Sequence, residues 1–291
     1  MLAIQRSGPL WLLCASLLAS CGSSKVPVIV GSKDGTEQMV LGEIVAQHLE
    51  HRLGRTVQRR TGLGTTAILY QTLLSSGVGI YPEYTGLIES EILKEPADPN
   101  PQIVLARVRQ ELDRTAQIEV LDPLGFDNPS VMAVSATGAD QPASLSDAAL
   151  AKTRWTVGMT YEFQSRPDAF QALAPYRLPL AGTRIIDAKQ LFDSLAKGDV
   201  NMIATRATDG HLMSPDWKIA ADDKKVFPTY EACLLARKDL LAAEPKLRPA
   251  LAELSGKFNL ETMRKLNAQV DLEHRPVAAV AADFLAQAGL R

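Results

Sequence analysis

Cysteine is scarce in this sequence, with three among 291 residues. Cys14 lies inside an apolar run near the N-terminus and Cys21 follows that run, so Cys233 is alone in the remainder of the chain. A lone cysteine cannot form an internal disulfide, and no Cys/Cys or Cys/His spacing typical of a metal site is present. The sequence therefore excludes a disulfide framework and indicates neither a metal centre nor a cofactor.

The sequence also lacks a charge excess and a second long apolar run. Its 31 Lys and Arg residues nearly balance its 33 Asp and Glu residues, whereas a nucleic-acid-binding protein is expected to carry a basic patch. After the N-terminal run, no apolar stretch approaches the roughly 20 residues needed to cross a bilayer. These absences argue against a nucleic-acid partner and against a chain that is itself a membrane permease.

The N-terminal segment predicts export. Arg6 precedes the run "PLWLLCASLLA", Pro9 to Ala19, whose apolar core of about 10 to 14 residues is too short for a spanning helix and typical of a secretory signal. The letters "LAS" before Cys21 and "GSS" after it resemble a bacterial lipoprotein cleavage box. We expect a signal peptide at 1–20, a lipidated Cys21 and a tether at 21–25, and therefore an extracytoplasmic (periplasmic), membrane-anchored lipoprotein. The alternative is an ordinary signal peptide with an incidental cysteine.

From Val26 onward, short β-rich runs alternate with amphipathic segments, an arrangement that implies parallel sheets covered by helices on both faces. Thr36 to Leu53, for example, carries apolar residues at helical spacing and is closed by Gly54. From about Tyr230 onward only helices are predicted. The predicted strands are "VPVIVG", "TVQRRTG", "VGIY", "IEVLD", "SVMAVSA", "RWTVGM", "TRII" and "VNMIA", and the predicted helices are 36–53, 65–74, 85–93, 103–115, 145–152, 167–174, 188–197, 245–254, 260–270 and 276–288.

Two α/β halves in a secreted chain of this size suggest two lobes with a cleft between them. Ligands of such sheets bind beyond the carboxyl ends of the strands, at helix N-termini. The loop "GSKDGTEQ", which contains Lys33, and the loop "GLGTT", which contains Thr65 and Thr66, fit that position. Neither loop alone is strong evidence, because glycine before a helix is usual turn chemistry.

Tyrosine is also scarce, with six residues in the chain, yet "GIYPEYTGLIE" places Tyr81 and Tyr84 three apart. Together with "VGSKDGTEQMVLGEIVAQHLE", "GLGTT", "DDKKVFPTYEA", "LSGKFNLETMRKLNAQV" and "VAADFL", this motif resembles the quaternary-amine class of ABC-transporter substrate-binding proteins, which handle glycine betaine, choline and related compatible solutes. The resemblance extends from about Val26 to Leu290. It suggests that Tyr84 lines the ligand site and that Tyr81 packs inside a lobe.

The resemblance implies an α/β, two-lobed type II periplasmic-binding-protein fold with a hinge of two crossing strands. Lobe 1 would be discontinuous, at 26–127 plus 230–291, and lobe 2 would be 128–229, with crossovers near 126–130 and 228–231. The family role implies a betaine-like solute and separate ABC permease and ATPase subunits as partners, no catalytic activity and no cofactor. We expect a monomer.

The resemblance also implies a box of tyrosines around the ligand. A quaternary ammonium cannot donate a hydrogen bond, so aromatic rings hold it by cation–π attraction of about 0.5 to 2 kcal/mol per ring. Tyr84 and Tyr230 match two positions of the box. At the other two, this chain has Ser130 in "NPS" and Arg206 in "RATD". Arg166 in "EFQSRPD" matches a family arginine that helps to hold the ligand's acid end.

Arg206 bears most strongly on the ligand. Two unit charges 4 Å apart repel by about 4 kcal/mol at an effective dielectric of 20, so an arginine inside the box disfavours choline, whereas its planar fork suits a carboxylate. Alternatively, Arg206 faces solvent or pairs with Glu83 or Asp209, and both Arg206 and Arg166 have a plain surface interpretation. We therefore expect a zwitterionic or anionic solute, with Asp209 also counted among the candidate ligand-binding residues.

Other functions remain open from the sequence. The ligand could be an ergothioneine-like betaine or an amino acid derivative, and the protein could be a sensing lipoprotein without transport or an enzyme on the same scaffold. His48 and His51 lie three apart on a predicted helix. With no third metal ligand in view, we interpret both as helix-surface residues.

Overall fold

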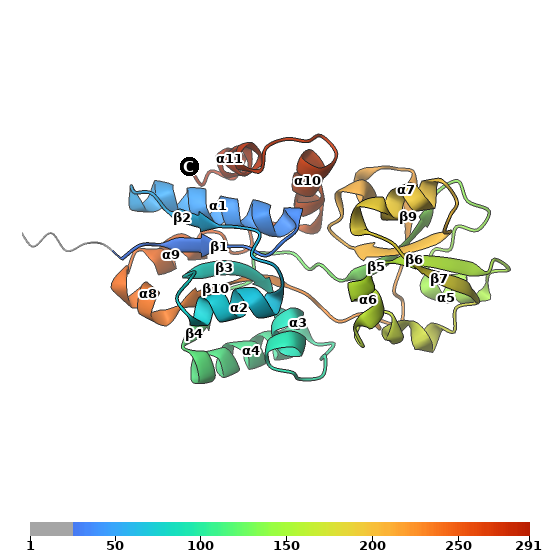
Figure 1. Cartoon of the computed structure of the whole chain (residues 1–291), viewed down its shortest axis with the longest axis horizontal. Coiled ribbons are helices and arrows are strands. Elements are labelled where there is room, and N and C mark those ends of the chain that lie inside the picture. Colours follow the sequence, from blue (N-terminus) through green and yellow to red (C-terminus); the bar gives the residue numbers. More distant parts are fainter. Residues whose placement is uncertain (1–25) are drawn as a thin grey trace, which may run out of the picture.

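A computed structural model describes residues 26–291. The expected signal peptide, lipidated Cys21 and tether lie outside the described residues. Figure 1 shows two α/β lobes, each built around one five-stranded sheet, joined by extended segments. The two-lobed α/β fold expected from the sequence is confirmed. Among the helices between residues 26 and 291, none is both long and apolar enough to cross a membrane.

The first sheet has the strand order β2-β1-β3-β10-β4. β1 pairs in parallel with β2 and β3, whereas β10 runs antiparallel to β3 and β4. The prediction of wholly parallel sheets is therefore wrong, and β10 lies where the sequence predicted only helices. The strands are β1 (Ile29–Gly31), β2 (Gln58–Arg60), β3 (Ile80–Tyr84), β4 (Ile118–Val120) and β10 (Ala232–Arg237).

The sequence of β10 explains why it was missed. Its core "ACLLA" is a continuous apolar run, and periodicity cannot distinguish such a run from a buried helix segment. Leu234 faces one buried cluster of the lobe, and Cys233 and Leu235 face another. Both faces of the strand are thus covered, which removes the alternation that marks a half-buried strand.

The second sheet has the order β7-β6-β8-β5-β9. β6 is parallel to β7 and β8, and β5 is antiparallel to both of its neighbours. The short edge strand β9 was not predicted. The strands are β5 (Ser130–Ser135), β6 (Trp155–Met159), β7 (Leu180–Ile185), β8 (Met202–Arg206) and β9 (Trp217–Ala220).

Helices cover both faces of the first sheet. One face packs against α1, α9, α10 and α11, and the other against α2 and α4. The last helix buries Val280, Ala281, Phe284 and Leu285 and is therefore a packing helix. These helices are α1 (Thr36–Leu53), α2 (Thr66–Leu74), α3 (Thr85–Leu87), η1 (Ile88–Ile92), α4 (Pro101–Ala116), α8 (Lys238–Ala243), α9 (Leu247–Ala252), α10 (Leu260–Asp271) and α11 (Val277–Gln287).

The helices of the second lobe are short, and one prediction for them is wrong. No α-helix occupies 167–174; α6 ends at Ser165, and a 3-10 helix follows at η2. Arg166 precedes Pro167 and has an extended backbone, because a residue before proline is disfavoured from the helical region. The helices of this lobe are α5 (Leu145–Leu150), α6 (Tyr161–Ser165), η2 (Gln171–Tyr176), η3 (Ala188–Gln190), α7 (Leu191–Ala196) and η4 (Gly210–Met213).

The helix-surface interpretation of His48 is also wrong. His48 is fully buried, with Nδ1 3.2 Å from the Leu290 carbonyl oxygen and Nε2 2.8 Å from that of Ala250. The reason is that α9 and the C-terminal segment cover this part of α1. His51, one turn away, is exposed as expected.

The chain passes from the first sheet to the second between β4 and β5 and returns between β9 and β10. The two crossing segments are hydrogen-bonded to each other: the Asn128 amide donates to the Tyr230 carbonyl at 3.2 Å and the Ala232 amide donates to the Phe126 carbonyl at 3.1 Å. Asp127 and Glu231 form an isolated antiparallel bridge. The returning segment therefore brings Tyr230 next to the end of β3.

Candidate functional site

The two predicted site tyrosines occupy neighbouring positions at one end of the first sheet. Tyr84 is the last residue of β3, and its register partner on β10 is Ala232, two residues after Tyr230. Both side chains are largely buried. Burial raises the pKa of each phenol, so both remain protonated hydrogen-bond donors at neutral pH. Tyr81, by contrast, is buried in the core between the sheet and α4, as expected.

Tyr230 contacts the second lobe. Its hydroxyl donates to the Asp168 carboxylate and accepts from Arg166 Nη2. Arg166 in turn binds Asp168 through two hydrogen bonds, of 3.0 Å from Nε and 2.6 Å from Nη2. Burial raises the pKa of Asp168, but the bonds from Arg166 and Tyr230 outweigh it and lower the net pKa. The group is therefore a phenol, a carboxylate and a guanidinium that join the lobes.

Arg206 faces the same ring. Its Cζ lies 5.1 Å from the Tyr230 ring centroid, and that of Arg166 lies 5.4 Å away. Arg206 Nη2 is 3.6 Å from Glu162 Oε1, and the same carboxylate accepts from Arg166 Nη1 at 3.2 Å. Arg206 thus lies beside an aromatic ring of the predicted site, and neither it nor Arg166 is a plain surface residue.

The ion pairs considered for Arg206 in the sequence are wrong. Glu83 is fully buried and accepts from Lys33 instead. Asp209 accepts from the Thr205 hydroxyl at 2.6 Å and from the amide of His211 at 3.0 Å. Both carboxylates are bound by other groups that lie close to them in the fold. The spacing of residues along the sequence does not reveal these partners.

Tyr84 has a different set of neighbours. Its hydroxyl donates to Glu37, on the first turn of α1. Lys33 Nζ lies 5.0 Å from its ring centroid and donates to Thr66 Oγ1 at 3.1 Å. The structure thus brings Lys33, Thr66 and Tyr84 together. Thr65 is exposed at the N-cap of α2, where its side chain makes no capping bond.

Ser130 is buried and pairs with Arg206 in the β5–β8 register. The small side chain takes the place of a ring beside the guanidinium, so this side of the site is polar. At two of the four positions where the resemblance implies an aromatic wall, the chain has a hydroxyl and a cation on adjacent strands.

Sequence reasoning missed several polar residues around the two tyrosines. Glu37, Glu162 and Asp168 are the acidic partners described above, and Asn128 donates to Glu37 at 3.0 Å. Neither amide atom of the buried Gln38 has a hydrogen-bond partner within the part of the chain that the structure describes. The text "GTEQ" at the start of α1 was a usable signal for Glu37 and Gln38, because it follows a glycine loop at a helix N-terminus.

The arrangement suits binding of a small charged molecule. Tyr84 lies beside the Glu37 carboxylate, whereas the Tyr230 ring faces two guanidinium groups. Lys33 also lies over the Tyr84 ring, and Asp168 and Glu162 accompany the two arginines, so each end of the site combines an aromatic ring with charges of both signs. Between residues 26 and 291, no three His, Cys, Asp or Glu side chains gather in a way that could hold a metal ion.

Solved structures share this fold. A crystal structure of a glycine betaine/carnitine/choline ABC transporter superposes with a TM-score of 0.82 at 23% identity, over 90% of this chain and 99% of that one. Apo YehZ from Escherichia coli superposes with a TM-score of 0.75 at 26% identity, over 91% of this chain and 99% of that one. The expected type II periplasmic-binding-protein fold is thereby confirmed.

Relatives in sequence cover nearly the whole chain. A glycine-betaine-binding protein of Pseudomonas aeruginosa is 31% identical over 293 residues, which are 95% of this chain and 92% of the relative. The carnitine transport binding protein OpuCC of Listeria monocytogenes is 29% identical over 286 residues, 94% of this chain and 93% of the relative. The Helicobacter pylori protein named "Ergothioneine transport permease/ergothioneine binding protein EgtU" is 30% identical over 289 residues, 97% of this chain, but the chain spans only 52% of its length.

Residues 26–287 match the family described as the substrate-binding domain of the ABC-type glycine betaine transport system. The match covers both lobes and both crossing segments. The residues around Tyr84 and Tyr230 lie within it, at the end of one sheet and beside the second lobe. The chain therefore belongs to the family of substrate-binding domains of ABC-type glycine betaine transport systems.

Proposed function

We propose that this protein binds a small zwitterionic solute, a betaine, between its lobes and delivers it to an ABC permease. The observation that carries the ligand chemistry is the pair of guanidinium groups facing the Tyr230 ring. Asp168 balances the charge of Arg166, so a ligand cation at that ring is repelled chiefly by Arg206, by about 4 kcal/mol at 4 Å and an effective dielectric of 20. This repulsion exceeds what one ring contributes by cation–π attraction. A ligand carboxylate at the same place is attracted by the arginines instead of repelled.

Arg206 is the group that we assign to the ligand carboxylate. Arg166 is already bound to Asp168 by two hydrogen bonds, whereas the ion pair of Arg206 with Glu162 is 3.6 Å long and Glu162 is 66% exposed. Exposed ion pairs contribute about 0 to 1 kcal/mol, so a ligand carboxylate can replace Glu162. Ser130 lies beside this group.

The cationic end of the solute belongs at Tyr84, where Glu37 supplies negative charge. Lys33 also lies over this ring, but the buried Glu83 balances its charge. We retain Lys33, Thr65, Thr66 and Asp209 as candidate ligand-binding residues, with Thr66 supported by its contact with Lys33.

A receptor of this kind works outside the cytoplasm. We propose a lipid anchor at Cys21, a periplasmic location, a monomeric state and separate permease and ATPase subunits. We place lobe 1 at 26–127 plus 230–291 and lobe 2 at 128–229. Binding would favour the closed arrangement of the lobes, which the permease would read.

A second candidate ligand is an ergothioneine-like betaine, which carries a bulky heterocycle beside its trimethylammonium and carboxylate. The Helicobacter pylori relative named for ergothioneine favours it. Ser130 supports it further, since it is smaller than the ring that the resemblance implies at this position next to Arg206.

Calorimetric titration of residues 22–291 tests the proposal. Glycine betaine, carnitine, ergothioneine and choline are the ligands, and we expect a zwitterion to bind at least tenfold more tightly than choline. Arg206→Ala should weaken binding of the zwitterion about tenfold or more and strengthen binding of choline, because it removes one of the two cations at Tyr230 and leaves the one that Asp168 balances. Mass spectrometry of the same samples should return the ligand unchanged.

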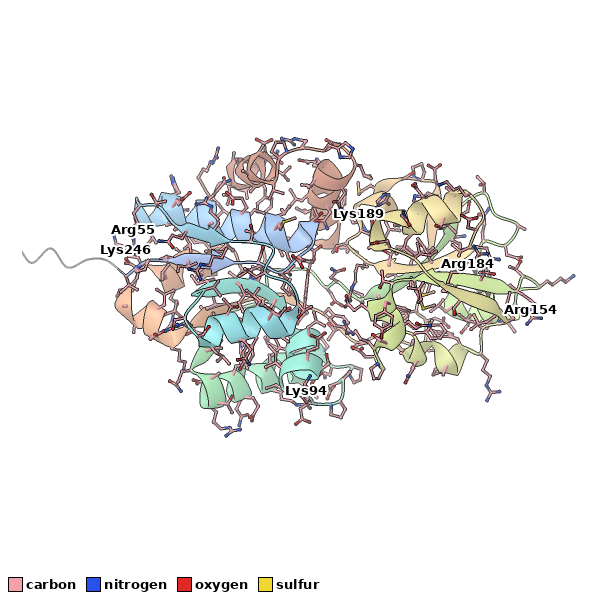
Figure 2. The ribbon with its side chains drawn as sticks, viewed as in Figure 1. Arg55, Lys94, Arg154, Arg184, Lys189 and Lys246 are labelled. Carbon is pink, nitrogen blue, oxygen red and sulfur yellow. The ribbon has the colours of Figure 1, made fainter. Side chains whose placement is uncertain are left out.

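The control is Arg184→Ala. Arg184 is an exposed arginine on β7, the edge strand of the second sheet, and is labelled in Figure 2. The Arg184→Ala substitution removes the same charge from the same lobe and should change neither the affinity for the zwitterion nor the affinity for choline. Micromolar choline binding that Arg206→Ala leaves unchanged would contradict the assignment, and conversion of the ligand would favour an enzyme.

A further inference from the structure

The second lobe also contacts the first lobe through a turn at 207–210, between β8 and η4. This turn packs against α10, which Figure 1 shows as the helix of the first lobe that extends toward the second. Arg264 Nε donates to the Ala207 carbonyl at 2.6 Å. A Cβ built on Gly210 would lie 2.6 Å from the backbone nitrogen of Ala268. The two backbones are therefore in direct contact.

Two buried asparagines hold the peptide groups of Thr208 in this turn. Asn267 Nδ2 donates to the Thr208 carbonyl at 2.9 Å, and the Thr208 amide donates to Asn128 Oδ1 at 3.2 Å. Asn267 lies on α10 and Asn128 on the first crossing segment. The turn is thus bound to the first lobe and to the hinge at the same point.

Both asparagines also bind one carboxylate, that of Glu37. Asn267 Nδ2 donates to Glu37 Oε2 at 2.9 Å, and Asn128 Nδ2 donates to Oε1 at 3.0 Å. Glu37 Oε1 accepts in addition from the Tyr84 hydroxyl. One carboxylate therefore connects a tyrosine of the candidate ligand site to the contact between the lobes.

We propose that the 207–210 turn is the fixed point about which the lobes move, and that Glu37 is a positioning residue that links Tyr84 to this fixed point. The coupling rests on the proposed function, since it requires Tyr84 to contact the ligand. Moving Thr208 away from α10 would break hydrogen bonds that are buried and partly charge-assisted, leaving polar groups without partners. Motion that keeps the turn in place and opens the lobes elsewhere breaks none of them.

The fixed point is tested without any ligand. Spin labels at Lys94→Cys and Gln171→Cys, two exposed positions on opposite lobes, report the interlobe distance in residues 22–291 by pulsed electron resonance. Gly210→Ala and Asn267→Leu should shift or broaden the distance distribution. Gly182→Ala is the control, because a Cβ there meets nothing within 4 Å. Distributions that match the parent protein in both test variants overturn the fixed point.

The coupling is tested by a double-mutant cycle on glycine betaine or ergothioneine affinity. Tyr84→Phe keeps the ring and removes the hydrogen bond to Glu37. Its effect should be at least about fivefold smaller or larger in the Asn267→Leu background than in the parent protein, since contacting networks are not additive. Additive effects overturn the role of Glu37. Glu37→Gln, which keeps an acceptor oxygen, should retain more affinity than Glu37→Ala.

Failure of the proposed function gives a different result. If neither betaine binds, the ligand assignment is wrong, whereas the distance measurement still decides the fixed point. In that case Tyr84→Phe should itself alter the ligand-free distance distribution, because Glu37 links Tyr84 to the fixed point, and an unchanged distribution overturns the coupling.

Discussion

Tyr230 is the residue at which the site and the lobe contact coincide. Its hydroxyl donates to Asp168 and accepts from Arg166, while its ring faces Arg166 and Arg206. Since burial raises the pKa of this phenol, it keeps its proton and its donor role across the neutral range. Ring and hydroxyl therefore have separable functions.

Replacing Tyr230 by Phe tests that separation. The variant keeps the ring but removes one hydrogen bond each from Asp168 and Arg166, which costs about 1 to 3 kcal/mol in a buried site. We expect glycine betaine or ergothioneine affinity to fall by about tenfold, measured by calorimetry. Tyr81→Phe is the matched control, because the buried Tyr81 hydroxyl has no hydrogen-bond partner among residues 26–291. An equal loss in both variants would contradict a specific role for Tyr230.

The candidate site residues were easier to predict than their partners. Tyr84, Tyr230, Arg166 and Arg206 stand in motifs whose order along the chain identifies them. Glu162 was not predicted as the partner of Arg206, because the pairing depends on how α6 lies against β8. The local sequence does not show how far apart two separate elements lie in the fold.

At the scale of elements, α1 depends on a buried histidine. His48 contacts the carbonyl oxygens of Ala250 and Leu290, which connects α1 to α9 and to the C-terminal segment. A long helix whose polar residue lies inward cannot be recognised from apolar spacing alone, so the sequence misplaced this residue.

His48→Leu should destabilise the protein. The change removes the ring N–H and so leaves a buried carbonyl oxygen without its donor, at about 1 to 3 kcal/mol. Urea unfolding followed by circular dichroism measures the loss. His51→Leu, on the exposed side of the same helix, should differ from the parent by less than about 0.5 kcal/mol. Equal midpoints for the two variants would refute the connecting role of His48.

The stability of the protein should depend on pH through His211, which lies in the 3-10 helix η4. His211 Nδ1 is 2.9 Å from Asp209 and the ring stacks on Phe192 at 4.4 Å. The hydrogen bond with Asp209 raises the pKa of His211 above 6.5, aided by the charges of Asp271 and Asp193 against an opposing effect of burial.

A histidine whose pKa is raised on folding stabilises the folded state below its unfolded pKa and loses that contribution as pH rises through the folded pKa. The urea midpoint should therefore fall between about pH 6 and about pH 8.5 by more in the parent than in His211→Gln. Because His211 is partly exposed, solvent screening keeps the difference small. His51→Gln should retain the slope of the parent, and an unchanged slope in His211→Gln would exclude the effect.

Sequence patterns predicted elements well where one face of an element is exposed. Residues 103–115 were predicted as a helix and α4 spans Pro101–Ala116, with an Asn100 cap that accepts from the Gln102 amide at 3.0 Å. They failed for β10, which is buried on both faces, and at 167–174, where Pro167 stops a helix. The failures share a cause: tertiary burial or a local steric rule overrode the apolar pattern.

At the scale of the whole molecule, the division into two lobes followed from the alternation of strands and helices and from the family resemblance. The packing of the 207–210 turn on α10 did not, because it joins residues that are distant in sequence and carry no motif. The contact depends on the close approach of Gly210 to Ala268, a property of the assembled fold.

The proposed anchor predicts where the protein is found. Cys21→Ser removes the thiol that would carry the lipid, so the full-length variant should move from the membrane fraction to the soluble fraction of the cell envelope. Immunoblotting of the two fractions measures the change. Cys233→Ser, at a cysteine buried in β10, should stay with the membrane. Equal sedimentation of Cys21→Ser and the parent would contradict lipidation.

β10 also determines the order in which this protein can fold. It is the fourth strand of the first sheet, and it pairs Ala232 with Tyr84 and Leu235 with Val120. The first lobe therefore stays incomplete until the entire second lobe has been synthesised, and such distant pairings form slowly. The second lobe, whose strands are contiguous in the chain, can fold earlier. For the export that we propose, the consequence is that the largest core of the protein closes last, after the whole chain has been synthesised.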